Sequence, residues 1–109
     1  ITDYPDQIPC LAKKSSKGPW YERWELYLGG IETVNCYTEE TDRKAAEHFF
    51  REQEKLKENS IVNHPVDKSY TDIFSAGFPE CSGAALGIDR LVMAVTGAEK
   101  IQDVISFTF

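Results

Sequence analysis

The chain has 109 residues, of which 41% are hydrophobic and 28% charged, and this composition predicts one soluble domain with a single core. Its 18 acidic side chains outnumber its 12 basic ones. The net charge of −6 argues against a protein that binds nucleic acid through phosphate contacts. No apolar run approaches the roughly 20 residues of a membrane helix, so we expect a cytoplasmic protein without membrane contact.

The cysteine count disfavours a disulfide framework and a zinc site, because the number is odd and no CxxC spacing occurs. We expect three free thiols, buried or half-buried, as is usual for free cysteine. They are Cys10, Cys36 and Cys81.

Residues 1–19 predict a loop-rich lead-in, because prolines and a Lys/Ser/Gly run interrupt any apolar period. A short extended piece is expected at residues 1–4, since a residue before proline prefers β geometry. From Tyr21 to Leu28 apolar and polar side chains alternate, which predicts a strand. Gly29 and Gly30 allow the positive φ angles of a tight turn, and a second strand is expected over residues 31–37.

A two-residue turn at this position also predicts the register of the hairpin. Leu28 would then face Ile31, and Tyr27 would face Glu32. One face would collect a charged and aromatic set that is either solvated or part of a site, namely Arg23, Glu25, Tyr27 and Glu32. The other face would be core, formed by Trp24, Leu26, Leu28 and Ile31.

The rest of the chain alternates helical and extended signals. A helix with a narrow apolar stripe is expected over residues 42–59, capped by Thr41 or Asp42. Further expected elements are a short helix over 69–76 that ends at Gly77, a strand over 81–87, a helix over 88–95 that ends at Gly97, and a turn with a strand-like end over 101–109. This order predicts an α+β fold, an antiparallel sheet with packed helices.

Small residues before the last helix are a candidate ligand site. Gly83, Ala85 and Gly87 would let a ligand approach the backbone, and Asp89 could cap the helix. Arg90 lies in the first helical turn, where a cation opposes the helix dipole unless a phosphate binds there. The alternative is that the small residues only permit close packing and that Arg90 pairs with a carboxylate.

Glu32 and Glu39 are candidate ligands for Mg²⁺ or for a substrate ammonium, although carboxylates on surface strands are common. Their spacing of seven residues would place them on opposite faces of a straight strand. They can share a face only if one lies beyond the strand end or past a bulge. His48 is expected on the helix surface and His64 in a loop, with no ligand spacing.

Residues 83–93 resemble motif 3 of class II aminoacyl-tRNA synthetases in its lysyl form. Residues 22–27, and residues 30–35 with Glu39, resemble the lysyl-type block that precedes it, and residues 101–107 also match. The resemblance covers nearly the whole chain. It implies that residues 1–109 are the C-terminal part of a class II synthetase catalytic domain.

Within this family, residues 79–83 and 64–67 resemble the shorter branch that attaches β-lysine to elongation factor P. Lysyl-tRNA synthetases usually have glycine where this chain has Ala85, and one methyl group is worth about 1–3 kcal/mol of discrimination. The resemblance therefore favours elongation factor P as acceptor. A lysyl-tRNA synthetase acting on tRNA-Lys, and a class II module without catalysis, are the alternatives.

The implied reaction activates lysine or β-lysine with ATP and Mg²⁺ as an aminoacyl-adenylate. The resemblance assigns catalysis to Arg90, ATP binding to Glu32, Gly87 and Arg90, substrate binding to Gly83, Asn35, Ala85 and Glu39, and metal binding to Glu32 and Glu39.

Motifs 1 and 2 of the family, including an arginine that contacts the α-phosphate, have no match in the chain. We therefore expect about the last third of a catalytic domain, inactive by itself. The parent enzyme would be a homodimer, because motif 1 carries the family's dimer contact.

Overall fold

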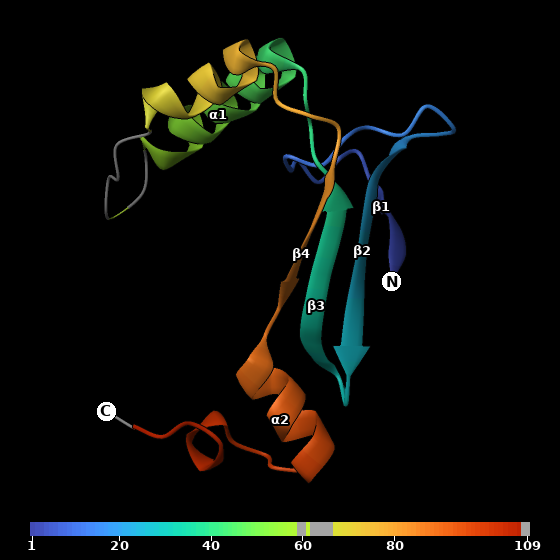
Figure 1. The fold of residues 1–109 in the computed structure, drawn as a ribbon, viewed down its shortest axis with the longest axis vertical. Coiled ribbons are helices and arrows are strands. Elements are labelled where there is room, and N and C mark those ends of the chain that lie inside the picture. Colours follow the sequence, from blue (N-terminus) through green and yellow to red (C-terminus); the bar gives the residue numbers. More distant parts are fainter. Residues whose placement is uncertain (59–60, 62–66, 108–109) are drawn as a thin grey trace.

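A computed structural model describes residues 1–58, 61 and 67–107, and within them four strands form one antiparallel sheet in the order β1-β2-β3-β4 (Figure 1). The strands are β1 (Thr2–Pro5), β2 (Trp20–Leu28), β3 (Ile31–Thr38) and β4 (Ser82–Leu86). The helical elements are α1 (Arg43–Lys57), the 3₁₀ segment η1 (Lys68–Ala76), α2 (Ile88–Thr96) and the 3₁₀ turn η2 (Ile101–Asp103). The predicted α+β class is confirmed.

The turn between β2 and β3 has the predicted two residues. Gly29 and Gly30 have φ angles of 57° and 83°, which suit glycine. The register next to the turn is also as predicted, with Tyr27 opposite Glu32 and Leu28 opposite Ile31.

A bulge interrupts β3 three residues after the turn. Tyr27 pairs with Glu32, but the neighbouring Leu26 pairs with Val34, so Thr33 is an extra residue in β3. Opposed residues of an antiparallel pair share a face. Glu32 and Val34 therefore lie on opposite faces, although two residues apart they would share a face of a regular strand.

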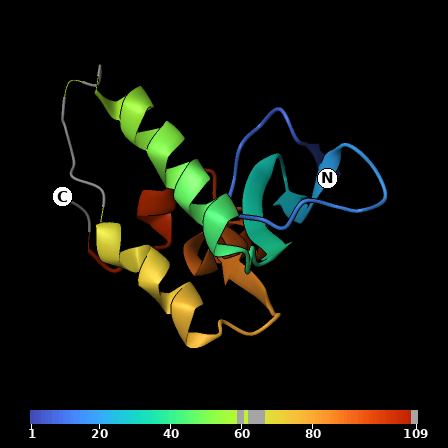
Figure 2. The same cartoon turned by 90° about the horizontal axis from the view of Figure 1, so that it is seen from above.

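The helix α1 begins after Asp42, whose side chain accepts a hydrogen bond from the Lys44 amide at 2.8 Å. It lies beside η1 (Figure 2), and Phe50 packs edge-to-face on Tyr70 with ring centroids 5.1 Å apart. Arg43 links the two elements through Ser75 and Asp72. The predicted end of η1 at Gly77, with φ 81°, is confirmed. The predicted loop at residues 59–60 and 64–65, with His64, lies outside the described residues.

The helix α2 has Gly87 as its N-cap and Gly97, where φ is 74°, as its C-cap. The predicted cap at Asp89 is wrong, because Asp89 lies inside the first helical turn. The turn expected at the start of residues 101–109 is present, but no strand follows it as far as residue 107, where a turn and bends succeed η2. Residues 108–109 lie outside the described part.

The lead-in contains β1, as predicted, and its later residues contact β2 and the residue that follows β3. Isolated bridges join Ala12 to Glu39 and Lys14 to Tyr21. The Lys13 amide donates to the Thr38 carbonyl at 2.8 Å, and its ammonium pairs with Glu80 at 2.8 Å. The lead-in therefore borders the end of β3.

The helices lie at the two ends of the sheet, α1 with η1 at one and α2 with η2 at the other (Figure 1). The predicted core face is consequently wrong: Trp24, Leu26 and Ile31 are 43%, 42% and 37% exposed. In the described residues the buried apolar side chains are Ala12, Ala46 and Met93. The radius of gyration is 17.1 Å, against about 13 Å for a compact domain of this length.

Two further expectations have a mixed outcome. All three cysteines are free, and Cys10 and Cys36 are half-buried as predicted, but Cys81 is exposed. His48 lies exposed on α1. No helix in the described part of the chain is long and apolar enough to span a membrane.

Candidate functional site

A pocket of about 250 Å³ lies where β3 and β4 meet. The pairing of the two strands puts Asn35 opposite Ala85 and Tyr37 opposite Gly83. All four residues that were predicted to bind the substrate therefore lie around this one pocket. The pocket is lined by Asn35, Tyr37, Glu39, Gly83, Ala84 and Ala85.

Glu39 is held on both sides at the rim of this pocket. Its amide donates to the Cys81 carbonyl at 2.9 Å, and Ala12 bridges it from the other side. Its carboxylate lies over Gly83, where a Cβ atom would come 2.5 Å from Oε1. An added Cβ atom would therefore displace the carboxylate, which is directed over the pocket floor.

Asn35 contributes an unsatisfied acceptor to the pocket. Its Oδ1 is buried and finds no hydrogen-bond partner among the residues that the structure describes. A buried polar atom without a partner is costly, by about 1–3 kcal/mol. A ligand with an N–H donor, such as an ammonium group, fits this atom.

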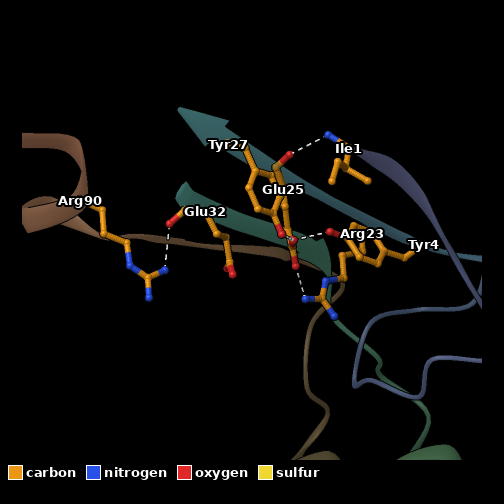
Figure 3. Close-up of polar contacts among 7 residues, drawn as sticks. All are labelled: Ile1, Tyr4, Arg23, Glu25, Tyr27, Glu32 and Arg90. Atoms are coloured by element: carbon orange, nitrogen blue, oxygen red, sulfur yellow. Dashed lines mark hydrogen bonds and ion pairs between the residues drawn. The ribbon is translucent and has the colours of Figure 1, made fainter. Parts of the chain in front are cut away.

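The predicted nucleotide-binding residues meet at the other end of β3. An Nη atom of Arg90 donates to the backbone carbonyl of Glu32 at 2.8 Å (Figure 3). Gly87 is adjacent, and a Cβ atom there would lie 3.2 Å from Cδ of Arg90. Arg90 is exposed and a guanidinium has five N–H donors, so this bond leaves capacity for a phosphate.

The bulge at Thr33 removes the difficulty of the odd spacing between Glu32 and Glu39. Glu32 lies on the face of Tyr27 and Glu25, which is also the face of Asn35. The two glutamates are nevertheless about 20 Å apart along the strand at about 3.3 Å per residue, too far to share one ion. No group of three or more metal-ligating side chains occurs in the described residues.

A buried carboxylate lies between the two ends of the site. Glu25 is 5% exposed, and it pairs directly with Asn35 across the strands. Tyr27 donates to its Oε2 at 2.7 Å, Tyr4 donates to the same oxygen, and Arg23 pairs with Oε1 (Figure 3). The charged face of the hairpin is therefore a connected network rather than a solvated surface.

The network changes the proton affinities of its members. Burial alone would raise the pKa of Glu25, but the hydrogen bonds from Tyr4, Tyr27 and Arg23 lower it further than burial raises it. Burial and the neighbouring Glu25 carboxylate raise the pKa of Tyr4. Glu25 is thus ionised and the Tyr4 hydroxyl protonated at neutral pH.

The sequence predicted the shared face of Arg23, Glu25 and Tyr27 but no role for Glu25 in the site. Tyr4 comes from the lead-in, and its partnership with Glu25 depends on a pairing across 21 positions. The register predicted from the turn alone would pair Glu25 with Val34, and only the bulge at Thr33 brings Glu25 opposite Asn35, so the sequence carried no signal for this pairing.

The fold agrees with comparisons to known proteins. The family described as class II tRNA synthetases (D, K and N) matches residues 1–109, and the chain belongs to this family. It is 46% identical, over 99% of its length, to the elongation factor P–(R)-β-lysine ligase of Salmonella dublin. It is 44% identical to the proteins of the same name from Salmonella paratyphi B and Salmonella enteritidis PT4. The chain spans about a third of these relatives, 34% of their length.

Proposed function

We propose that these residues form the C-terminal part of the catalytic domain of a ligase that activates lysine or β-lysine with ATP and transfers it to elongation factor P. The observation that carries the proposal is the pocket on β3 and β4. It combines a carboxylate, Glu39, with the unsatisfied acceptor of Asn35, and both suit the ammonium groups of a diamino acid. The names of the relatives support the acceptor.

The nucleotide would bind at the opposite end of the same face. Arg90 is anchored by the Glu32 carbonyl and would contact the terminal phosphate of ATP with its remaining donors. Gly87 lets the Arg90 side chain lie close to the backbone, since an added Cβ atom would come 3.2 Å from Cδ of Arg90. Glu32 supplies one carboxylate for Mg²⁺, which commonly binds one or two carboxylates together with substrate phosphates. When bound, the ion would neutralise phosphate charge.

The proposed reaction has two steps. A carboxylate oxygen of the amino acid attacks the α-phosphorus of ATP, and pyrophosphate leaves, which gives the aminoacyl-adenylate. An amine of the acceptor then attacks the acyl carbon, and AMP leaves. The residues described here act by holding the two reactants in line and by balancing charge rather than as nucleophiles.

Lysyl-tRNA synthetase activity is the second candidate, because the matching family also includes lysine-specific tRNA synthetases. The net charge of −6 supports a protein acceptor, since binding to tRNA draws on clustered basic side chains. Ala85 also supports the ligase, because its methyl group lies beside Asn35 in the lining of the pocket and reduces the space for the substrate.

The test is an acceptor assay on the full-length protein that contains these residues. Radiolabelled lysine and β-lysine are supplied with ATP and Mg²⁺, with either elongation factor P or tRNA-Lys as acceptor. We expect label on elongation factor P, with β-lysine preferred. Label on tRNA-Lys alone would support the synthetase, and no pyrophosphate exchange with either amino acid would contradict both activities.

A further inference from the structure

Three consecutive carbonyl groups at the start of β3 each accept a hydrogen bond from a different donor. The Ile31 carbonyl accepts from the Thr33 hydroxyl at 3.1 Å, and the Glu32 carbonyl accepts from Arg90 at 2.8 Å. The Thr33 carbonyl accepts from the Gly87 amide at 2.9 Å. The bulge and the start of α2 are therefore joined at two successive positions, Glu32 and Thr33, and the third bond lies within the bulge itself.

Thr33 is the residue that makes this junction possible. It is 3% exposed, and it is the extra residue of the bulge. Its carbonyl accepts a hydrogen bond from the Gly87 amide at the start of α2, and its hydroxyl donates a hydrogen bond to the Ile31 carbonyl. Short side-chain to backbone bonds of this kind stabilise irregular backbone where a regular strand would otherwise form.

The bulge also decides which face Glu32 occupies. Without an extra residue, the pairing of Leu26 with Val34 would continue regularly, and Glu32 would lie on the opposite face from Asn35. The same residue thus determines the place of a carboxylate, Glu32, and the starting point of the helix that carries a cation, Arg90.

We propose that Thr33 is a positioning residue for the nucleotide half of the site, acting through Glu32 and Arg90. The inference rests on the proposed function, since it concerns the ATP side of that reaction. It predicts an unequal effect on the two substrates. Asn35 and Glu39 lie beyond the bulge and keep their own pairing with β4 and the lead-in, so the amino-acid side should not change.

The hydroxyl can be removed with almost no change of shape by Thr33→Val in the full-length protein. We expect the KM for ATP in amino-acid-dependent pyrophosphate exchange to rise about fivefold or more. The KM for the amino acid should stay within about twofold, and Thr33→Ser, which keeps the hydroxyl, should match the parent. Thr33→Ala, which also lacks the hydroxyl, should repeat the result of Thr33→Val and replaces it if that variant does not fold.

The inference is overturned if both hydroxyl-free variants keep the parent KM for ATP, or if both KM values rise equally. It is also overturned if Thr33→Ser is as impaired as Thr33→Val, because the effect would then come from packing. A parent protein without exchange activity would instead refute the proposed function. An active parent whose Thr33→Val and Thr33→Ala variants both keep its KM for ATP refutes this inference alone.

Discussion

Gly83 lies directly beneath the carboxylate of Glu39, at a place where an added Cβ atom would come 2.5 Å from Oε1. No carbon atom fits at that distance without displacing the oxygen. The backbone of Glu39 is held by the Cys81 carbonyl and by the bridge to Ala12, so its side chain would have to move.

Gly83→Ala should therefore raise the KM for the amino acid about tenfold, because the carboxylate loses its position above the pocket. The KM for ATP should change little, since Arg90 lies at the other end of β3. Both values are measured by pyrophosphate exchange with the full-length protein. Ser82→Val adds volume on the other face of β4, outside the lining of the pocket, and is the control. An equal effect of the two substitutions would contradict the prediction.

Arg90→Ala should weaken ATP binding by about tenfold or more, because a charge-assisted hydrogen bond to phosphate is lost. Calorimetric titration of the full-length protein with ATP and Mg²⁺ measures the affinity. Arg51→Ala removes an exposed arginine from α1 and should leave it unchanged. An unaltered affinity in the Arg90 variant would refute its assignment to the nucleotide.

Ala85→Gly should shift preference from β-lysine towards lysine by about tenfold, the worth of one methyl group in a pocket. The reason is that Ala85 lies beside Asn35 in the lining of the pocket and that lysyl-tRNA synthetases, which the chain resembles, usually have glycine there. The ratio of kcat/KM for the two amino acids measures the shift. An unchanged ratio would show that the methyl group does not contact the substrate.

Glu25 should make stability depend on pH. Burial raises its pKa and the bonds from Tyr4, Tyr27 and Arg23 lower it, and the net pKa is below the usual 4.5. A lowered pKa in the folded state stabilises the fold above the unfolded-state pKa. That contribution disappears as the pH falls through the folded-state pKa.

Glu25→Gln should therefore cost about 3 kcal/mol at pH 7, where Arg23 loses a buried partner. The difference from the parent should shrink as the pH falls below 4.5. Urea denaturation of the full-length protein over this range measures both. Glu22→Gln changes an exposed residue of the same strand and serves as the control. A difference that is constant with pH would mean that the charge of Glu25 does not stabilise the fold.

Residues 1–109 alone should catalyse no lysine- or β-lysine-dependent pyrophosphate exchange. The α-phosphate arginine expected from the family resemblance has no match in the chain, and the apolar face around Trp24 is exposed. The assay compares these residues with the full-length protein at equal concentration. Exchange above background would show that the two ends of this face suffice for activation.

Local signals in the sequence were enough for most of the fold. The glycine pair predicted the turn and the register beside it, because two residues with positive φ leave few ways to connect strands. The positions of Asn35, Gly83 and Ala85 in one pocket follow from strand pairing and were anticipated by the family resemblance.

Three features depended on information that no local pattern carries. Alternation identified an apolar face with Leu26 on it, but alternation does not say whether another layer covers that face. The bulge at Thr33 has no residue signature, because any residue of a strand can be the extra one. The hydrogen bond from Arg90 to the Glu32 carbonyl was also missed, because it joins residues that are 58 positions apart in the sequence.

The single extra residue in β3 limits how the gene for this region can vary. Deleting or inserting one codon between Glu32 and Asn35 would exchange the faces of the two residues relative to each other. The same change in the exposed loop around Lys17 would alter only a connection. Homologous genes should therefore keep the length of the first stretch constant, even where its residues differ, and should show gaps in the second.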